Sequence, residues 1–333
     1  MKTLITISDI SLKRILFSTE ALEKLYAISE VHWIEEGKIY SVEELKNAIP
    51  QYDACITSWH SPKFTSEVLN EAVNLKFIGH AAGTVVPIMD EDIFQKKIVV
   101  VNANNVLARS TAEHTVGLMM AGAWNHNGFN LNLKRGIWGK SSEGIVMGLY
   151  KQTIGLIGYG CISKEVIRLL KPYDVEILLY SKHCNNEEAD ALGVKLVNLE
   201  KLLKESQIIS LHNTLTDSTK GMFGKKELSL IKDGALLVNT SRAAIIEERA
   251  LIESLSENRY FAAIDVYHTE PLSQNYELLK LKNVFCTPHI GGFSSYWRSK
   301  FGEIIIDDLI RWTNGEKVQG EITLEMFRRL TPK

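Results

Sequence analysis

The feature that most constrains the fold is an alternation along almost the whole chain, in which apolar runs of strand length are followed by amphipathic stretches of helix length. This alternation is typical of βα units, whose strands lie parallel in a sheet. In the first third of the chain it predicts strands at Leu4–Ile7, Ala54–Trp59, Phe77–His80 and Ile98–Val101, and helices at Glu20–Ile28, Val42–Ile49 and Thr65–Ala72. Ser41, with Glu44 three residues later, has the pattern of a capping box.

A second series of the same kind begins near residue 152. It predicts six strands, at Thr153–Ile157, Glu176–Tyr180, Ile208–His212, Ala235–Asn239, Ala262–Val266 and Val284–Thr287, with helices between them that include Ser163–Leu170, Leu199–Lys204 and Glu247–Leu255. Six strands with crossover helices fit a doubly wound dinucleotide-binding domain. Two longer helices flank this series, at Ser110–Trp124 with Ser110 or Thr111 as its cap, and at Tyr296–Thr313 before the stop signal Asn314-Gly315.

The length of 333 residues is typical of two domains. After the last long helix the chain is too short for a third domain, so its end is predicted to return to the first one. We therefore predict an α/β protein with two doubly wound parallel sheets. One is a flavodoxin-like substrate domain, made of residues 1–103 plus 298–333, and the other is a Rossmann dinucleotide-binding domain, made of residues 104–297.

Charge and cysteine content exclude several classes of protein. The formal net charge is -2 and basic residues are scattered, so nucleic acid and anionic membranes are not expected partners. No run of 18 apolar residues predicts a transmembrane helix, and the β-like start at Thr3–Ile7 does not resemble a signal peptide. The cysteines are far apart and lack metal spacing, which predicts no metal site and a reducing, cytoplasmic location; they are Cys55, Cys161, Cys184 and Cys286.

A glycine-rich turn is the most informative local motif. An apolar strand ends in Gly158-x-Gly160-x-x-Ser163, and an amphipathic helix follows at once. Gly158 permits the tight turn, and Gly160 lets a pyrophosphate approach the backbone. The helix N-terminus, at Cys161 and Ile162, would then offer N–H groups to the phosphates. This context predicts a dinucleotide site rather than a structural βα turn.

The end of the next strand bears on the choice of cofactor. In NAD-binding proteins an acidic residue at this place binds the adenosine ribose, but here the chain reads Ser181-Lys182-His183. Because no carboxylate would repel a 2′-phosphate and Lys182 can pair with it, NADP(H) is favoured. NAD(H) remains possible, since Lys182 and His183 are equally consistent with solvated loop residues.

Six ordered motifs lie between residues 75 and 320. They are Thr111-Ala-Glu-His114, Arg135-Gly-x-Trp138, Leu211-His212-x-x-Leu215-Thr216-x-x-Thr219, Asn239-Thr-Ser-Arg242, Asp265-Val-Tyr-His-Thr-Glu270-Pro271-Leu272 and Thr287-Pro288-His289-Ile-Gly-Gly292. Together they resemble the D-isomer-specific 2-hydroxyacid dehydrogenases, which include phosphoglycerate dehydrogenase and hydroxypyruvate and glyoxylate reductases. The resemblance implies hydride transfer between NAD(P)H and a small 2-oxo or D-2-hydroxy acid. It also implies a homodimer, formed through the Ser110–Trp124 helix and the Arg135–Trp138 segment.

Three residues would carry the reaction by this resemblance. Arg242 suits the binding of the substrate carboxylate and carbonyl, because a guanidinium forms paired hydrogen bonds. His289 can give and take a proton near neutral pH. Glu270 would orient His289 and favour its protonated form.

The resemblance also implies the binding residues. Asp265 would accept a hydrogen bond from the nicotinamide carboxamide, and further nucleotide contacts would come from Asn213, Thr214, Thr219 and Thr240. Backbone N–H groups at Ala82 and Gly83 would bind the substrate carboxylate, whereas His80 and Trp59 either line this pocket or fill the core.

Several positions depart from the family pattern. Ala243 replaces a usual Gly, Asn213-Thr214 replaces an apolar–Pro pair, Asn102-Ala103-Asn104 lacks a frequent Pro, and Gly83-Thr-Val-Val-Pro replaces a common Gly-x-Asp-x-Ile-Asp sequence. These departures leave the acid itself open: glycerate, glyoxylate, lactate, a bulkier 2-oxo acid or a phosphorylated one.

Two alternatives are weighed against an enzyme of this kind. A dinucleotide-sensing interaction protein on the same fold would have little turnover, but the intact Arg242, Glu270 and His289 argue against it. A relative of formate dehydrogenase would be expected to have Gln in place of Glu270 and a longer N-terminal extension; this sequence shows neither feature, so this alternative is not favoured.

Overall fold

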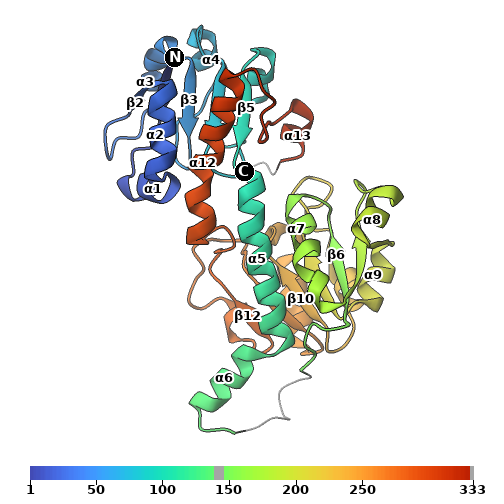
Figure 1. Cartoon of the computed structure of the whole chain (residues 1–333). Coiled ribbons are helices and arrows are strands. Elements are labelled where there is room, and N and C mark those ends of the chain that lie inside the picture. Colours follow the sequence, from blue (N-terminus) through green and yellow to red (C-terminus); the bar gives the residue numbers. More distant parts are fainter. Residues whose placement is uncertain (139–145, 331–333) are drawn as a thin grey trace. The chain divides into compact units, whose positions relative to one another are not determined.

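The computed structural model describes residues 1–138 and 146–330, which form two compact units (Figure 1). The first unit comprises residues 1–107 and 293–333, and the second comprises residues 108–292. These boundaries lie a few residues from the predicted ones, and residues 331–333 of the predicted first domain fall outside the described residues. The roles of the two domains in binding substrate and cofactor stay predictions.

The first unit contains a five-stranded parallel sheet in the order β2-β1-β3-β4-β5. This is the flavodoxin-like order that was predicted. Its strands are β1 (Lys2–Ile5), β2 (Glu30–Trp33), β3 (Ala54–Thr57), β4 (Phe77–His80) and β5 (Val99–Asn102). The sequence did not predict β2, because this edge strand has no fully buried residue and its apolar pattern is weak.

Helices cover both faces of this sheet, and the alternation of strand side chains explains why (Figure 1). Ile5 and Ile56 pack against one set of helices, and their neighbours Leu4 and Cys55 pack against the other. The first set is α1 (Ile10–Leu16), α2 (Thr19–Ile28) and α12 (Ser295–Thr313); the second is α3 (Val42–Ala48), α4 (Ser66–Glu71), η2 (Glu91–Gln95) and α13 (Leu324–Arg328), with the short turn η1 (Ile49–Gln51) after α3. The predicted capping box at Ser41 and Glu44 is confirmed.

The second unit contains a seven-stranded parallel sheet in the order β12-β11-β10-β9-β6-β7-β8. Its strands are β6 (Thr153–Ile157), β7 (Glu176–Tyr180), β8 (Lys195–Leu196), β9 (Ile208–Leu211), β10 (Leu236–Asn239), β11 (Phe261–Ile264) and β12 (Val284–Cys286). All six predicted strands are present, and the two-residue β8 adds a seventh. The winding direction reverses between β6 and β9, and in doubly wound sheets ligands bind at such a reversal.

The helices of the second unit also lie on both faces of its sheet. The buried cluster on one face includes α5 (Asn104–Ala123), α7 (Cys161–Leu170) and α8 (Asn186–Leu192), and that on the other includes α9 (Leu199–Glu205), α10 (Lys225–Ser229) and α11 (Glu248–Ser256). The remaining elements are α6 (His126–Lys134), η3 (Lys171–Tyr173), η4 (Ala243–Ile245) and η5 (Glu277–Lys280). The fold is therefore α/β, with two doubly wound parallel sheets.

The predicted start of the first long helix is wrong. Helix α5 begins at Asn104, so Ser110 and Thr111 lie inside it and are buried rather than serving as its cap. Hydroxyl residues compete with helical hydrogen bonds and therefore resemble caps in a sequence. Here the Ser110 hydroxyl donates to the carbonyl of Gly291, at 2.7 Å, and this tertiary partner lets a polar side chain lie in a buried helix interior.

Candidate active site

A paired glutamate and histidine form the centre of the candidate site. Glu270 follows β11 and His289 follows β12, so both lie beyond the carboxyl ends of neighbouring strands. Nδ1 of His289 donates to Oε2 of Glu270 over 2.7 Å, and the backbone N–H of Tyr267 donates to Oε1 over 3.0 Å. Both side chains remain about two-fifths exposed, at 45% for His289 and 38% for Glu270. These hydrogen bonds fix the orientation of the two side chains, and their exposed parts can still contact a ligand.

The backbone at His289 is held in a left-handed conformation, with φ of 53°. A residue other than glycine pays on the order of 1–3 kcal/mol for such a conformation. Asp265, which is buried, opposes this cost: its carboxylate accepts hydrogen bonds from the backbone N–H groups of Ile290 and Gly291, each at 3.0 Å. Asp265 therefore fixes the turn that presents the imidazole.

Two more side chains bind the same carboxylate. Thr287 donates to Oδ1 of Asp265 over 2.6 Å, and Nε2 of His114 lies 3.3 Å from the same atom. Burial alone would raise the pKa of Asp265, but the hydrogen bonds from His114, Thr287 and Ile290 outweigh it and lower the pKa. The carboxylate thus stays ionised. Sequence reasoning assigned no role to His114, Tyr267 or Thr287; the only signal was their place within the quoted motifs.

Arg242 lies in a loop that Asn239 organises. Asn239 ends β10, and its side-chain amide donates to the carbonyl of Arg242 over 3.2 Å while its carbonyl oxygen accepts from the N–H of Ser241 over 3.0 Å. Nη1 of Arg242 donates to the Ser241 carbonyl over 2.7 Å. Within the described ranges Arg242 has no carboxylate within ion-pair distance. Its planar donors are therefore available for an anionic ligand.

The charge of Glu270 acts on Arg242. Burial lowers the pKa of the Arg242 guanidinium, and the Glu270 carboxylate acts in the opposite direction. Guanidinium, carboxylate and imidazole thus gather beyond β10, β11 and β12, although tens of residues separate them in the chain. Arg242 could bind the carboxylate of a 2-oxo acid, and His289 could give a proton to its carbonyl oxygen.

A cavity of about 550 Å³ opens beside Glu270 and His289. Its walls are mainly apolar and its lining residues are Tyr267, Glu270, Pro271, Leu272, Leu279, Cys286, Thr287, Pro288 and His289. Burial raises the pKa of the Cys286 thiol, so this cysteine is protonated and unreactive at neutral pH. The volume suits a small molecule.

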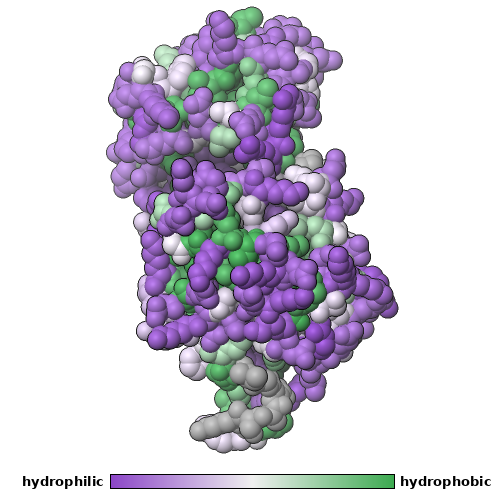
Figure 2. Space-filling view, turned by 90° about the vertical axis from the view of Figure 1, so that its right-hand side faces the viewer, coloured by the Kyte–Doolittle hydropathy of each residue, from purple (hydrophilic) through white to green (hydrophobic). Residues whose placement is uncertain are grey.

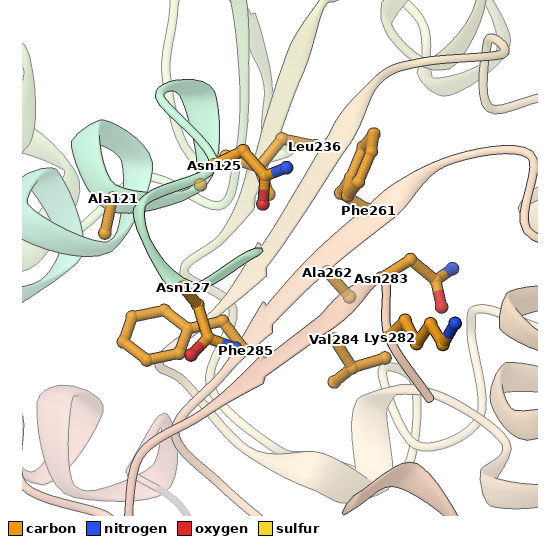
Figure 3. A pocket seen from close by; sticks show the side chains of 11 residues that line it. Ala121, Asn125, Asn127, Leu236, Phe261, Ala262, Lys282, Asn283, Val284 and Phe285 are labelled. Carbon is orange, nitrogen blue, oxygen red and sulfur yellow. The ribbon is translucent and has the colours of Figure 1, made fainter. Parts of the chain in front are cut away.

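A second hollow in the same unit is too small to be a ligand site. It lies by the start of β11 and β12, where Asn125, Phe261 and Val284 face it (Figure 3). Its volume of about 20 Å³ holds roughly one water molecule.

The glycine turn has the geometry that a pyrophosphate needs. Gly158 adopts a φ of 104°, and an added Cβ would lie 2.8 Å from the backbone of His212 and Asn213, at the end of β9. At Gly160, in contrast, an added Cβ would enter open space. Ser163 closes the turn, since its Oγ accepts from the N–H of Gly160 over 2.8 Å. The turn lies at the reversal of the sheet, ahead of α7, where Cys161 and Ile162 begin the helix.

Two buried polar atoms beside this turn lack protein partners. Among the described residues, Nε2 of His212 and Oδ1 of Asn213 are buried without a hydrogen bond. Burial lowers the pKa of His212 to about 4, so its imidazole is neutral at physiological pH. Unpaired buried polar groups are costly and call for a ligand or a water molecule. Together with the open space at Gly160 they fit a bound dinucleotide.

The remaining nucleotide candidates lie at neighbouring strand ends. Ser181 follows β7 and accepts from the N–H of His183 over 3.0 Å, and Lys182 is exposed with no ion pair in the part of the chain that the structure describes. Thr219 closes the loop after β9 by donating to the carbonyl of Thr214 over 2.6 Å. Thr240, which follows β10, forms a hydrogen bond of 2.8 Å with Thr115 through their hydroxyl groups.

The candidate substrate loop belongs to the first unit. Ala82 and Gly83 follow β4 and are buried. Asn102 donates to the carbonyl of Gly83 over 2.6 Å, and an added Cβ at Gly83 would lie only 2.5 Å from Leu107. His80 forms a hydrogen bond with Thr57, and burial lowers its pKa to about 3, so this histidine is a neutral core residue. The binding role of the loop stays a prediction.

Residues 1–138 and 146–330 contain neither a candidate metal site nor a candidate membrane-spanning helix. No group of three or more His, Cys, Asp or Glu side chains is placed to hold a metal ion. No helix in these ranges has the length and apolar character needed to cross a membrane.

Comparison with known proteins gives the family. Residues 116–291, more than half of the chain, match the model of the D-isomer specific 2-hydroxyacid dehydrogenase NAD binding domain. The chain belongs to this family. The match covers the glycine turn and the segments that carry Arg242, Glu270 and His289.

Individual relatives agree with this. The chain is 36% identical over 285 residues to D-3-phosphoglycerate dehydrogenase from Archaeoglobus fulgidus, which is 85% of this chain and 54% of that protein, so it spans about half the length of this relative. It is 34% identical over 302 residues to glyoxylate reductase from Thermococcus litoralis, covering 89% of this chain and 90% of that protein. The structure of D-lactate dehydrogenase with NAD+ from Lactobacillus jensenii matches with a TM-score of 0.80 and 26% identity, over 97% of this chain and 100% of that one.

Proposed function

We propose that this family member is an oxidoreductase that interconverts a small 2-oxo acid and the corresponding D-2-hydroxy acid with a nicotinamide dinucleotide. The observation that carries the proposal is the Glu270–His289 hydrogen bond of 2.7 Å, together with the Arg242 guanidinium, which has no ion pair in the described part of the chain and feels the charge of Glu270. A binding or sensing protein has no need of an acid–base group held in a left-handed backbone conformation. The same arrangement therefore favours an enzyme over a dinucleotide-sensing interaction protein.

Each of the three residues has one task in this proposal. Arg242 binds the substrate carboxylate and polarises the carbonyl with its in-plane N–H donors. His289 donates the proton to the carbonyl oxygen in reduction and removes it in oxidation. Glu270 orients the imidazole by accepting the hydrogen bond from its Nδ1. The bound cofactor supplies or accepts the hydride.

The cofactor would be held by the second unit. The turn at Gly158 and Gly160 and the first residues of α7, Cys161 and Ile162, would bind the pyrophosphate. Oδ1 of Asn213 has no hydrogen-bond partner among the described residues, which supports a polar contact at the reversal of the sheet. We place the nicotinamide by Asp265 and assign the other nucleotide contacts to Ser181, Lys182, Thr214, Thr219 and Thr240.

The first test is a panel of 2-oxo acids offered with NADPH and with NADH. We expect at least one acid to be reduced, with loss of the absorbance of the reduced nicotinamide and formation of the D-2-hydroxy acid alone. We also propose that the loop of Ala82 and Gly83 binds the substrate carboxylate through the backbone N–H of Gly83, since the N–H of Ala82 already donates to the carbonyl of His80 over 2.7 Å. If NADPH and NADH both bound but neither was oxidised with any acid in the panel, a dinucleotide-sensing interaction protein would replace this proposal.

The substitution Ser181→Asp is expected to shift cofactor preference toward NADH by roughly 10- to 100-fold in the ratio of kcat/KM values. A carboxylate at the end of β7 would repel the 2′-phosphate of NADPH and accept hydrogen bonds from the ribose hydroxyls of NADH. The measurement is the ratio with one fixed acid. Asn186→Asp is the matched control, because it adds the same charge at the start of α8. An unchanged ratio in Ser181→Asp would refute the NADP(H) preference.

We further propose that the protein is a homodimer. Large apolar side chains remain exposed at the end of α5 and along α6 and the segment after it: Trp124, Leu131, Leu133, Ile137 and Trp138, of which Trp138 is 84% exposed. Apolar atoms are visible at the lower end of the molecule in Figure 2, beside the grey atoms. Apolar surface of this kind is typically buried by association, and two-fold dimers are the commonest oligomers.

The cysteines support a cytoplasmic location, which we also propose. All four, Cys55, Cys161, Cys184 and Cys286, are free thiols in the structure. Free thiols are typical of proteins that work in a reducing compartment.

A further inference from the structure

The cavity beside Glu270 and His289 is larger than the smallest 2-oxo acids can fill. Its volume of about 550 Å³ lies within the range of roughly 300–1,000 Å³ that is typical of ligand pockets. All of its lining residues lie between positions 267 and 289, so the cavity belongs to the second unit alone. Beside its carbonyl group glyoxylate carries only a hydrogen atom, and pyruvate carries only a methyl group. Neither would occupy a space of this size.

Apolar side chains make up most of the cavity wall. They include Leu272, which packs against the buried core of the unit, and Leu279, in the short helix η5. Leu279 keeps 45% of its surface exposed although it lines this space. An apolar group placed in the cavity would remove this surface from water, which is favourable in proportion to the area covered.

The polar side chains in the wall already have partners. The Tyr267 hydroxyl donates to the Thr287 carbonyl over 2.9 Å, and the Thr287 hydroxyl donates to Oδ1 of Asp265 over 2.6 Å. The two carboxylate oxygens of Glu270 accept from the backbone of Tyr267 and from the ring of His289. A polar substituent placed here would lose hydrogen bonds to water, and these groups would not replace them.

The charge of the wall disfavours a second anionic group. Among the described residues that line the cavity, none is a lysine or an arginine, whereas Glu270 contributes a carboxylate. A phosphate or a second carboxylate would leave water without a permanently charged partner and would be repelled by Glu270. Phosphorylated and dicarboxylic 2-oxo acids therefore do not suit this space.

The place of the cavity beside the catalytic groups selects one part of the substrate. In a 2-oxo acid the carboxylate and the side chain lie on opposite sides of the carbonyl carbon. In the proposed function Arg242 binds the carboxylate and His289 protonates the carbonyl oxygen. Of these two residues, His289 alone lies in the cavity wall as the structure describes it. The side chain of the acid would then extend away from Arg242, past His289 and into the cavity.

We propose that this cavity binds the side chain of the substrate, and that this side chain is a branched aliphatic or aromatic group. The inference rests on the proposed function and narrows its substrate class to 2-oxo acids with a single carboxylate and a bulky apolar substituent. 4-Methyl-2-oxopentanoate and phenylpyruvate belong to this class. Leu272 and Leu279 determine the specificity by contacting the substituent.

The first test compares 2-oxo acids that differ in the side chain. Each methylene group that becomes buried should raise kcat/KM about fourfold. 4-Methyl-2-oxopentanoate, which has three more carbon atoms than pyruvate, should therefore exceed it by roughly 50-fold. Glyoxylate and 3-phosphohydroxypyruvate should also have lower kcat/KM values than 4-methyl-2-oxopentanoate. Equal values across the series, or the highest value for glyoxylate or the phosphorylated acid, would overturn the proposal.

Two opposite substitutions of Leu279 test the cavity itself. Leu279→Trp fills part of it and should lower the ratio of kcat/KM for 4-methyl-2-oxopentanoate to that for pyruvate by about 10-fold or more. Leu279→Ala enlarges it and should shift the preference from 4-methyl-2-oxopentanoate toward phenylpyruvate. A merely structural role of Leu279 would lower the rates with all acids alike. Wild-type ratios in both variants would contradict the proposal.

Met326→Trp is the matched control for Leu279→Trp. Met326 lies in α13 of the first unit and is 46% exposed, so it resembles Leu279 in exposure, but it is not part of the cavity wall as described. We expect its ratio of the two kcat/KM values to equal that of the wild type. If Met326→Trp lowered the ratio as much as Leu279→Trp, the effect would not come from the cavity and the proposal would fail.

A binding test without cofactor separates this inference from the proposed function. 4-Methylpentanamide carries the branched apolar group but has neither a carboxylate nor a 2-oxo group, so it cannot be turned over. In saturation-transfer NMR we expect its methyl signals with the wild type and with Met326→Trp, and a large loss of signal with Leu279→Trp. If no 2-oxo acid is reduced but the amide binds in this way, the proposed function fails and the apolar site stands. If acids are reduced and the methyl signals are the same in Leu279→Trp as in the wild type, the assignment of the cavity fails.

Discussion

Replacing His289 by alanine is expected to lower kcat by about 10²- to 10⁴-fold, the range for loss of a general acid–base group, while the reduced cofactor still binds. Nδ1 of His289 is occupied by Glu270, so the imidazole can exchange a proton with substrate only through its other nitrogen. Removing the ring leaves the developing alkoxide without a proton donor. Steady-state kinetics would measure kcat, and fluorescence titration with NAD(P)H would measure binding.

Two companion variants sharpen this experiment. Glu270→Gln should lower kcat less than His289→Ala does, because the imidazole remains but loses the carboxylate that orients it. His268→Ala is the matched control: its Nε2 lies 3.1 Å from the backbone carbonyl of Ile246 and is not bonded to Glu270 or His289 in the described residues, so kcat should change little. Near-normal turnover in His289→Ala would assign the proton transfer to another group.

Replacing Arg242 by lysine is expected to lower kcat/KM by about 10²- to 10³-fold, as removal of a donor to a developing oxyanion does. Lysine keeps the positive charge, but it is a point charge and cannot give paired hydrogen bonds to the carboxylate and the carbonyl oxygen. Both kcat and KM should be affected, since the same side chain is assigned to binding and to polarisation. Initial rates over a range of acid concentrations would separate the two.

The control for this variant is Arg249→Lys. Arg249 is exposed and pairs with Glu253 on α11, at 2.9 Å, so its replacement should leave the rate unchanged. Guanidine added to Arg242→Ala should partly restore activity if the missing group is a guanidinium. Normal kcat/KM in Arg242→Lys would show that charge alone suffices, and the paired-donor role would be withdrawn.

Local patterns predicted the central strands well because burial on both faces makes their sequences apolar throughout. β6 and β7 match the predicted bounds, and so does β4. The edge strands β2 and β8 were not predicted, because a partly exposed strand does not need a continuous run of apolar residues. The start of α5 was misplaced for a related reason: Ser110 is acceptable inside a helix only because Gly291, far along the chain, accepts its hydrogen bond.

The sequence by itself determined the chemistry that is present: a glycine turn between a strand and a helix, and the three groups Arg242, Glu270 and His289. These signals are local, since residue type and spacing are enough to express them. Only the tertiary structure decided how the groups are held, through the hydrogen bonds of Asp265 with Ile290, Gly291, Thr287 and His114. It alone showed which charges are paired: Arg249 has Glu253 as its partner, whereas Arg242 has no ion pair among the described residues. Whether a charge is paired depends on what folding brings beside it, and no spacing along the chain records that.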